Sequence, residues 1–391
     1  WGLGYRSGLS DSMGAPRWRL RGAARGRTLA PGSASVRLER TLPSRVSRGG
    51  GSEASSVTTL SRATANARSS WAPRRGRTFR ARASSSPARS GEESVSSVVA
   101  GMFASPLAFG VAGIPLVLAT SAAFAVTRQV LPFTFASLAL ASVLVIVWLN
   151  VTNDVFDSET GVDSEKVESV VNRTGQKGAL FWVATFLLAC GLSIFAAVVA
   201  IKGQLAAGAM LLGSVAIGYV YQGPPFRLSY KGVGEVLCFF AFGPLATNAF
   251  FLLQSGLRLP CLVEHPVALA SSVLLGLTTS AILLNSHYHQ VDTDRATGKV
   301  SPCVRFGTRA VSRAVVFVVA AVYCIFGCCL TTGILPRTAI VALLSLPSAL
   351  SLCRLVLGSH QDKVAIKPAK FFAVRWHKNF ALLLSLGLFL S

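Results

Sequence analysis

The chain has 391 residues, of which 51% are apolar and only 14% are charged, and its formal net charge is +22. So small a charged fraction is unusual for a soluble protein of this length and favours a membrane protein. The positive charge is concentrated in residues 1–90, which hold 18 Arg, no Lys and three acidic residues. Because this charge lies at one end and few aromatic residues lie among the arginines, the composition argues against a nucleic-acid-binding protein.

Residues 1–90 are also rich in Ser and Ala and are interrupted by Gly and Pro. This composition is typical of an organelle transit peptide. The segment has no apolar periodicity from which a core could form, so we expect a disordered leader that is removed between Arg80 and Glu93. Residues 98–390 are expected to form one membrane domain.

Nine apolar runs follow the leader, each close to the ~20 residues that a helix needs to cross the hydrocarbon of a bilayer. They occupy residues 98–124, 130–152, 179–201, 204–221, 233–254, 267–288, 311–333, 338–356 and 371–390. No amphipathic segments remain that could cover so many buried helices in a soluble protein. The sequence therefore predicts an all-α, polytopic membrane protein with about nine transmembrane helices around an intramembrane cavity.

Lys and Arg are unevenly distributed between the loops. The loops after the second, fourth, sixth and eighth runs are basic, whereas the alternate loops hold only Arg128, Lys202, Arg258 and Arg337. By the positive-inside rule, the basic loops share the cytosol-like face of the membrane. Two acidic clusters follow the second and the sixth run, so both are expected on this face, where they could form one site.

In the first cluster, Asp154 and Asp157 are three residues apart, so a helix would place both on one face, with Asn150 and Asn153 on the same stripe. A glycine beyond them permits a turn that would bring Asp163 back towards them. Carboxylate and amide oxygens suit Mg²⁺, which in turn binds phosphate oxygens. The sequence therefore predicts a magnesium site that grips a diphosphate.

The second cluster contributes Asp292 and Asp294 to the predicted metal site. Cations beside a metal would stabilise the charge of a leaving diphosphate. The candidate cations are Arg173, Arg227, Lys231, Arg295 and Lys299. Carboxylates next to hydrocarbon are costly and usually functional, although ordinary polar loops at the headgroup level are the alternative.

The sixth run ends in His287, Tyr288, His289 and Gln290. Two histidines that are two residues apart diverge by about 200° on a helix, so they cannot easily share one metal ion. Neutral imidazole is the base available near pH 7. We therefore predict that His287, His289 and Gln290 line the acceptor end of the site and that one histidine accepts a proton there. Glu235 is either a helix-start acid or a functional residue.

Several motifs together resemble one family, the UbiA-type membrane prenyltransferases. They are Asn-Asp-Val-Phe-Asp with Gly-Val-Asp at 153–163, Pro-Pro-Phe-Arg-Leu-Ser-Tyr at 224–230, Gly-Val-Gly-Glu at 232–235 and Ala-Phe-Gly-Pro at 241–244. The resemblance covers residues 98–390 and is narrowest to the enzymes that prenylate 1,4-dihydroxy-2-naphthoate. The His-Tyr-His-Gln run is similar to the plastid phytyltransferase branch. Bacterial relatives usually carry Arg-Asp where His289-Gln290 stands, which removes one candidate metal ligand.

The resemblance implies a Mg²⁺-dependent reaction in which a prenyl diphosphate, with phytyl expected, ionises and alkylates the naphthoate ring with loss of the carboxylate. It also implies a plastid membrane with the active-site loops on the stromal side. Homogentisate prenyltransferase and chlorophyll synthase are the nearest alternatives. An ion-coupled transporter is the alternative outside enzymes, but it would place acidic residues near helix centres rather than at helix ends.

Overall fold

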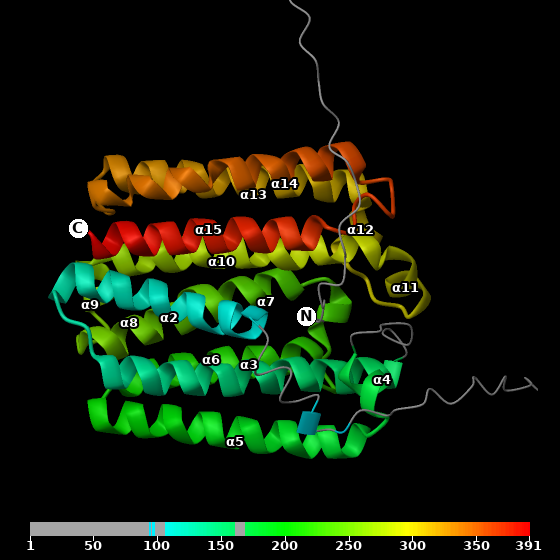
Figure 1. The fold of residues 1–391 in the computed structure, drawn as a ribbon, viewed down its shortest axis with the longest axis horizontal. Helices are drawn as coiled ribbons and strands as arrows, with labels where there is room; N and C mark the ends of the chain where they lie inside the picture. The colour runs from blue at the N-terminus through cyan, green and yellow to red at the C-terminus, as the bar shows by residue number, and fades with distance from the viewer. Residues whose placement is uncertain (1–93, 95, 98–105, 161–168) are drawn as a thin grey trace, which may run out of the picture. The chain divides into compact units, whose positions relative to one another are not determined.

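The computed structural model describes residues 94, 96–97, 106–160 and 169–391. Throughout this part of the chain the backbone forms helices joined by loops, without a strand, so the predicted all-α fold is confirmed. The long helices run side by side in Figure 1. They are α2 (Pro106–Thr127), α3 (Pro132–Thr160), α5 (Lys177–Lys202), α6 (Leu205–Gln222), α10 (Pro266–Ser286), α13 (Thr308–Thr331), α14 (Leu346–Ser359) and α15 (Ala369–Phe389).

Two spans are composite. One consists of α7 (Gly234–Phe240), the π-helix η2 (Ala241–Thr247) and α8 (Asn248–Ser255), and in the other the 3₁₀ helix η4 (Arg337–Ser345) leads into α14. The short elements are α4 (Val170–Thr174), η1 (Leu228–Lys231), α9 (Cys261–Glu264), η3 (His287–His289), α11 (Val291–Ala296) and α12 (Pro302–Phe306). The π-helix surrounds Pro244, which cannot donate a backbone N–H to a regular α-helix.

Seven helices or composite spans in the described residues are long and apolar enough to cross a membrane. Helix α2 is not among the seven, because its apolar segment Gly113–Thr127 is too short. Helix α15 is not among them either. Helix α15 carries Lys370, Arg375 and Lys378 within its first half. The exact number of nine membrane-spanning helices therefore stays a prediction.

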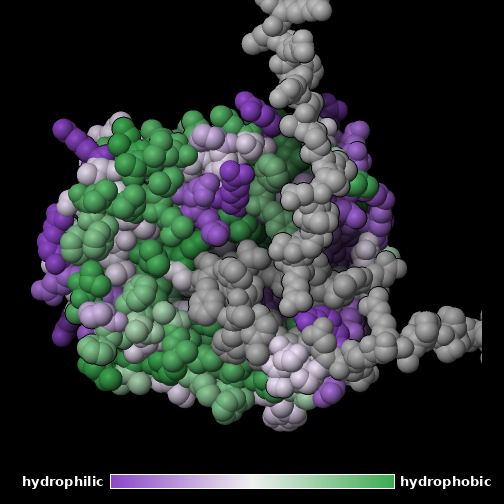
Figure 2. Space-filling model, in the orientation of Figure 1, coloured by the Kyte–Doolittle hydropathy of each residue, from purple (hydrophilic) through white to green (hydrophobic). Residues whose placement is uncertain are grey.

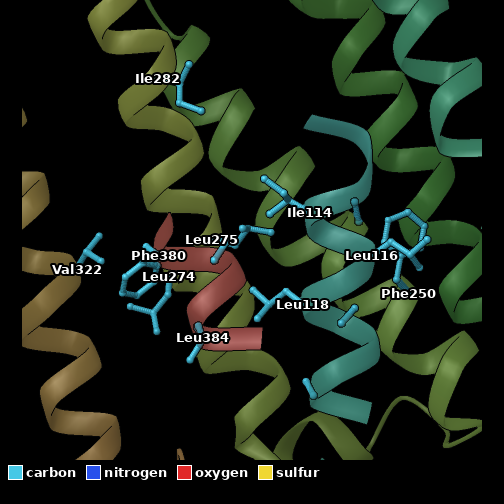
Figure 3. Packing of buried hydrophobic residues seen from close by; sticks show 14 of the residues in the cluster. Ile114, Leu116, Leu118, Phe250, Leu274, Leu275, Ile282, Val322, Phe380 and Leu384 are labelled. Atoms are coloured by element: carbon cyan, nitrogen blue, oxygen red, sulfur yellow. The ribbon is translucent and has the colours of Figure 1, made fainter. Parts of the chain in front are cut away.

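The hydrophobic core is built around α10. Leu274 and Leu275 of α10 lie close to Phe380 of α15 and to Leu118 of α2 (Figure 3), and all four side chains are buried. The most apolar window of α10 is 72% buried, whereas that of α6 is 17% buried. Most apolar side chains of helix α6 are therefore exposed or half-buried, as expected for a helix in contact with lipid.

Two glycines allow η2 to pack tightly against α10. A Cβ atom at Gly243 would lie 2.6 Å from the carbonyl oxygen of Ser272, and one at Gly276 would lie 2.8 Å from the ring of Phe239. Small residues permit such close approach between membrane helices. The close contact holds the π-helix against the centre of the bundle.

The ends of the helices form two separate polar regions. Helices α4, α11 and α12 lie at the right-hand end in Figure 1, whereas α9 and the C-terminus lie at the left-hand end. Hydrophobic residues cover much of the face shown in Figure 2, and hydrophilic residues lie along its left and right edges and in a smaller patch near its middle. Both acidic clusters belong to the right-hand end, because the first terminates α3 beside α4 and the second lies in α11.

Candidate active site at the acidic end of the bundle

The first acidic cluster occupies the last turns of α3. Asn150, Asn153 and Asp154 are buried, and Asp157 is half-buried. One carboxylate oxygen of Asp154, Oδ2, accepts the backbone N–H of Val170 at 2.9 Å, which attaches α4 to the end of α3. These four residues follow helical spacing on one stripe of α3, as predicted. Asp163 lies outside the described residues.

Asp157 is held by residues from the end of α6 and from η1. Its Oδ1 accepts hydrogen bonds from the Nε2 of Gln222 and, at 3.1 Å, from the hydroxyl of Tyr230. Ser229 donates to the Oε1 of Gln222 at 2.8 Å and fixes the orientation of that amide. Three segments of the chain therefore determine where this carboxylate points.

The second cluster contains a fully buried carboxylate, Asp294. Its Oδ1 lies 3.7 Å from the Nζ of Lys299, and its Oδ2 lies 3.6 Å from the Nδ1 of His287. Burial by itself raises the pKa of Asp294, but His287 and Lys299 outweigh it and hold the pKa below its usual value. Asp294 is therefore a buried anion between two cationic or proton-bearing partners. Both of its oxygens lack a hydrogen-bond partner among the described residues.

Asp292 points away from Asp294. It is exposed and forms an ion pair with Lys363, which lowers the pKa of Asp292. Side chains two residues apart on a helix diverge by about 200°, so α11 separates the two carboxylates. In the part of the chain described here, three or more His, Cys, Asp or Glu side chains nowhere converge in a way that could hold a metal ion. Those predicted ligands that the structure describes thus lie at one end of the bundle but not in one closed cluster.

Tyr230 in η1 connects the two clusters. Its hydroxyl reaches Asp157, its ring lies 5.6 Å from the Nζ of Lys299, and its carbonyl oxygen accepts the N–H of Val300 at 2.8 Å. Burial, and then the negative charge of Asp157, raises the pKa of Tyr230 above its usual value, so its hydroxyl stays protonated. A chain of contacts consequently runs from the first acidic cluster through Tyr230 and Lys299 to Asp294.

The five predicted cations occupy different environments. Arg173, Lys231 and Arg295 are exposed, whereas Lys299 is buried against Asp294. Arg227 donates to Glu159 at 2.8 Å and adopts a φ of 42°, a left-handed backbone conformation that is uncommon for a residue with a Cβ. Strained backbone of this kind gathers at functional sites. The structure thus places all five at the acidic end of the bundle.

The histidine run also divides. His287 is buried, with its Nε2 3.2 Å from the Oε1 of Glu235 and its Nδ1 near Asp294, so both ring nitrogens face carboxylates. His289 is exposed and Gln290 is half-buried. A proton acceptor needs a nitrogen that can reach the substrate, so the predicted proton transfer suits His289 better than His287.

Three residues outside the predicted set take part in the site: Gln222, Tyr230 and Glu235. The sequence leaves Glu235 as either a helix-start acid or a functional residue, and the structure gives it a contact with His287. Gln222 is buried at the end of an apolar helix, and a buried amide needs hydrogen-bond partners. That position was the signal available in the sequence, but its partner, Asp157, is distant along the chain and only the tertiary structure supplies it.

An apolar cavity lies deeper in the bundle. Its walls come from α2, α3, α5, α6, η2 and α8. Leu149 and Gly218 line its wall nearest to the acidic end. Leu149, Asn153 and Asp157 follow at intervals of four residues on one face of α3, as Gly218 and Gln222 do on α6. The cavity and the first acidic cluster therefore share the same helix faces, about 12 Å apart along α3.

An all-helical membrane fold with charged groups at one end and an apolar cavity beneath them suits a ligand with an anionic head and a hydrocarbon tail. Residues 94–378 match the model of the UbiA prenyltransferase family. The chain belongs to this family.

Two phytyltransferases are similar to this chain over most of its length. The chain is 41% identical over 285 residues to the chloroplastic 2-carboxy-1,4-naphthoquinone phytyltransferase of Arabidopsis thaliana, and this match covers 72% of the chain and 75% of that protein. It is 36% identical over 283 residues to the 2-carboxy-1,4-naphthoquinone phytyltransferase of a Synechocystis strain, covering 72% of the chain and 90% of the relative. The solved apo structure of a UbiA homolog from Aeropyrum pernix shares the fold, with a TM-score of 0.51 and 16% identity over 71% of this chain and 97% of that chain.

Proposed function

We propose that the protein transfers a phytyl group, or another prenyl group, from its diphosphate to 1,4-dihydroxy-2-naphthoate during quinone biosynthesis. The observation that carries the proposal is the alignment of the Asp157–Gln222 pair with the apolar cavity on the same faces of α3 and α6. A prenyl diphosphate needs such a site, because its head must reach ligands at the interface while its tail stays in an apolar environment. The names of the Arabidopsis and Synechocystis relatives support the naphthoquinone acceptor and the phytyl donor.

The reaction breaks two bonds and forms one. The bond between C1 of the allylic chain and the diphosphate oxygen breaks, and diphosphate leaves with the electron pair. A naphthol hydroxyl gives up its proton while the ring carbon that carries the carboxylate forms a bond to C1. The carboxylate then leaves as CO₂, its electron pair restores the aromatic ring, and the proton returns to the oxygen. Positive side chains at the acidic end offset the charge that collects on the leaving group. The closed helical frame keeps water from the allylic cation.

The donor set of the first cluster fits Mg²⁺. Asp154 and Asp157 supply hard carboxylate oxygens, and Asn150 and Asn153 add amide oxygens on the same stripe of α3. Asp163, Asp292 and Asp294 complete the proposed ligand set. Bound Mg²⁺ would neutralise and orient the diphosphate oxygens. For Asp294 to reach a metal, it would have to exchange its contacts with Lys299 and His287. Asp292 would have to leave its ion pair with Lys363 and turn towards the metal.

His289 and Gln290 are proposed to line the acceptor end of the site, with His289 as the proton acceptor for a naphthol hydroxyl. His287 is buried and lies between the carboxylates of Glu235 and Asp294, one on each ring nitrogen. This assignment follows from exposure, since His289 is the exposed histidine of the pair.

The protein is further proposed to act in a plastid membrane, with residues 1–90 as its transit peptide and the acidic end on the stromal side. The Arg-rich, acid-poor composition of these residues and the chloroplastic Arabidopsis relative support the compartment. The basic loops at the acidic end support the orientation. Residues 98–390 would then form the membrane domain.

A direct assay tests the proposal. The purified protein without residues 1–90 is incubated with Mg²⁺, phytyl diphosphate and 1,4-dihydroxy-2-naphthoate, and the product is identified by mass spectrometry. We expect a phytylated naphthoquinol that has lost CO₂, and no product when EDTA removes the metal. Parallel reactions with homogentisate and with chlorophyllide provide the rival acceptors. A product with either of these, and none with the naphthoate, would contradict the proposal.

A further inference from the structure

Tyr230 contacts both acidic segments at once. Its hydroxyl donates to the Oδ1 of Asp157 at 3.1 Å and lies 2.6 Å from the hydroxyl of Thr160. Its ring carries the ammonium of Lys299 at 5.6 Å, within the range of a cation–π contact. Asp157 belongs to α3, and Lys299 follows α11, so one side chain bridges two segments that are remote in sequence.

The backbone around Tyr230 is tied to the second segment as well. The carbonyl oxygen of Tyr230 accepts the N–H of Val300 at 2.8 Å, and that of Lys231 accepts Arg305 at 2.9 Å. Gly232 has a φ of 73°, and a Cβ there would lie 2.5 Å from the carbonyl oxygen of Val300. The loop that carries Tyr230 therefore has little freedom to move relative to residues 299–300.

Tyr219 lies at the same end of the bundle as Tyr230, but the two hydroxyls bind different acceptors. Tyr219 donates to the backbone carbonyl of Pro224 at 2.7 Å, a bond that holds only the local loop. Tyr230 donates to a carboxylate that already accepts Gln222, so it restricts the direction of that carboxylate. A hydrogen bond to a charged group is stronger than one between neutral groups.

We infer that Tyr230 is a positioning residue which fixes the Asp157 carboxylate relative to the Lys299 ammonium, so that both act together on the diphosphate head of the donor. The inference rests on the proposed function only in taking a prenyl diphosphate as the ligand. Small misplacement of groups that bind a reacting head is costly: about 1 Å lowers rates by about 100-fold. In this role, Tyr230 sets the distance between the Asp157 carboxylate and the Lys299 ammonium and does not itself contact the substrate.

The test compares three variants in detergent-purified full-length protein. Tyr230→Phe removes the hydroxyl and keeps the ring, and Tyr230→Leu removes both contacts. Tyr219→Phe is the matched control, which deletes a hydroxyl from the last turns of α6. The first measurement is Mg²⁺-dependent binding of geranylgeranyl thiodiphosphate, an unreactive donor analogue, by calorimetry. The second is kcat and KM for each substrate, and thermal unfolding is recorded for every variant.

We expect Tyr230→Phe to weaken binding of the analogue by about tenfold, the effect of losing one hydrogen bond to a charged group. Tyr230→Leu should weaken it further, because Lys299 also loses the ring. The Tyr230 variants should keep the KM of the unchanged protein for the acceptor. Tyr219→Phe should bind the analogue as tightly as the unchanged protein does. If this pattern of binding holds but the naphthoate yields no product, the acceptor assignment fails while the role of Tyr230 stands.

Two outcomes would overturn the inference. In the first, Tyr230→Phe binds the analogue as tightly as the unchanged protein, which means that Asp157 does not depend on the hydroxyl. In the second, Tyr230→Phe and Tyr219→Phe lose binding equally and in proportion to their loss of thermal stability. Tyr230 would then only pack the loop.

Discussion

At the residue scale, the central feature of the site is that three of its described carboxylates, Asp154, Asp157 and Asp294, contact partners from other parts of the chain. Asp154 accepts a hydrogen bond from a backbone N–H of α4, and Asp157 accepts hydrogen bonds from Gln222 and Tyr230. Asp294 lies close to Lys299 and His287. Preorganised charges of this kind stabilise a transition state without rearranging during the reaction. The loss of a single carboxylate should therefore affect the rate much more than the fold.

Replacing Asp154 by Asn tests the first cluster. The amide keeps the size of the side chain and an acceptor oxygen for Val170, but it removes the charge. We expect turnover to fall by about 100-fold or more, the size of effect that follows the loss of one electrostatic stabiliser. Insertion into membranes and thermal stability should stay close to those of the unchanged protein. Normal turnover at saturating Mg²⁺ would remove Asp154 from the metal site.

Asp294 permits a test that separates stability from catalysis. Asp294→Asn leaves the buried ammonium of Lys299 without a countercharge, and removing one partner of a buried pair costs about 3–5 kcal/mol. The midpoint of thermal unfolding in detergent should drop for this variant. It should recover in the double variant Asp294→Asn, Lys299→Met, in which neither charge remains, while turnover stays low. A double variant that is as active as the unchanged protein would show that the pair is purely structural.

At the scale of elements, α3 and α6 join the acidic cluster to the apolar cavity. On each of these two helices, one face lines the cavity, and the same face continues to the Asp157–Gln222 hydrogen bond at the end of the helix. The π-helix η2 forms another wall, and it is held against α10 by Gly243 and Gly276. The rigid packing around the cavity implies that its shape is set by side chains rather than by flexible loops.

A leucine at Gly218 should obstruct this cavity. Gly218 lines it, and a Cβ there would already lie 3.2 Å from the side chain of Leu149. We expect Gly218→Leu to raise KM for the prenyl diphosphate at least tenfold, with little change for the acceptor, in steady-state assays. Gly213→Leu on the same helix is the control, because Gly213 is not among the residues that line the cavity. Equal effects of both variants would argue against a tail-binding role.

At the scale of the whole molecule, charge is segregated between the two ends of the helices. The end that holds α4, α11 and α12 carries the acidic clusters and most of the cations, and Ser391 lies at the opposite end beside Arg128. Such segregation sets the orientation of a polytopic protein during insertion. Under the proposed function, the diphosphate would enter the site from the compartment that the acidic end faces.

Labelling of single cysteines tests this arrangement in sealed membranes. In a variant without the native cysteines, Cys introduced at Ser158 or Thr297 should react with an impermeant thiol reagent from the same side. Cys introduced at Ser391 should react only from the other side or after permeabilisation. Opposite sidedness of Ser158 and Thr297 would exclude a shared site.

The sequence by itself determined the class of fold, the family and the positions of the acidic clusters. Apolar runs of membrane-spanning length, the loop charges and the spacing of Asn150, Asn153, Asp154 and Asp157 are local properties, and they follow directly from helix geometry and the cost of charge in hydrocarbon.

Only the tertiary structure decided how the functional side chains are paired. Whether Asp292 faces Asp294 or solvent, and which histidine is buried, depends on how η3 lies between α7 and α11 and on where Lys363 lies relative to α11. The bridge through Tyr230 joins residues that are remote along the chain, such as Asp157 and Lys299. These contacts depend on how the helix ends converge, which a periodic pattern along the chain does not specify because it fixes the faces of a helix and not its neighbours.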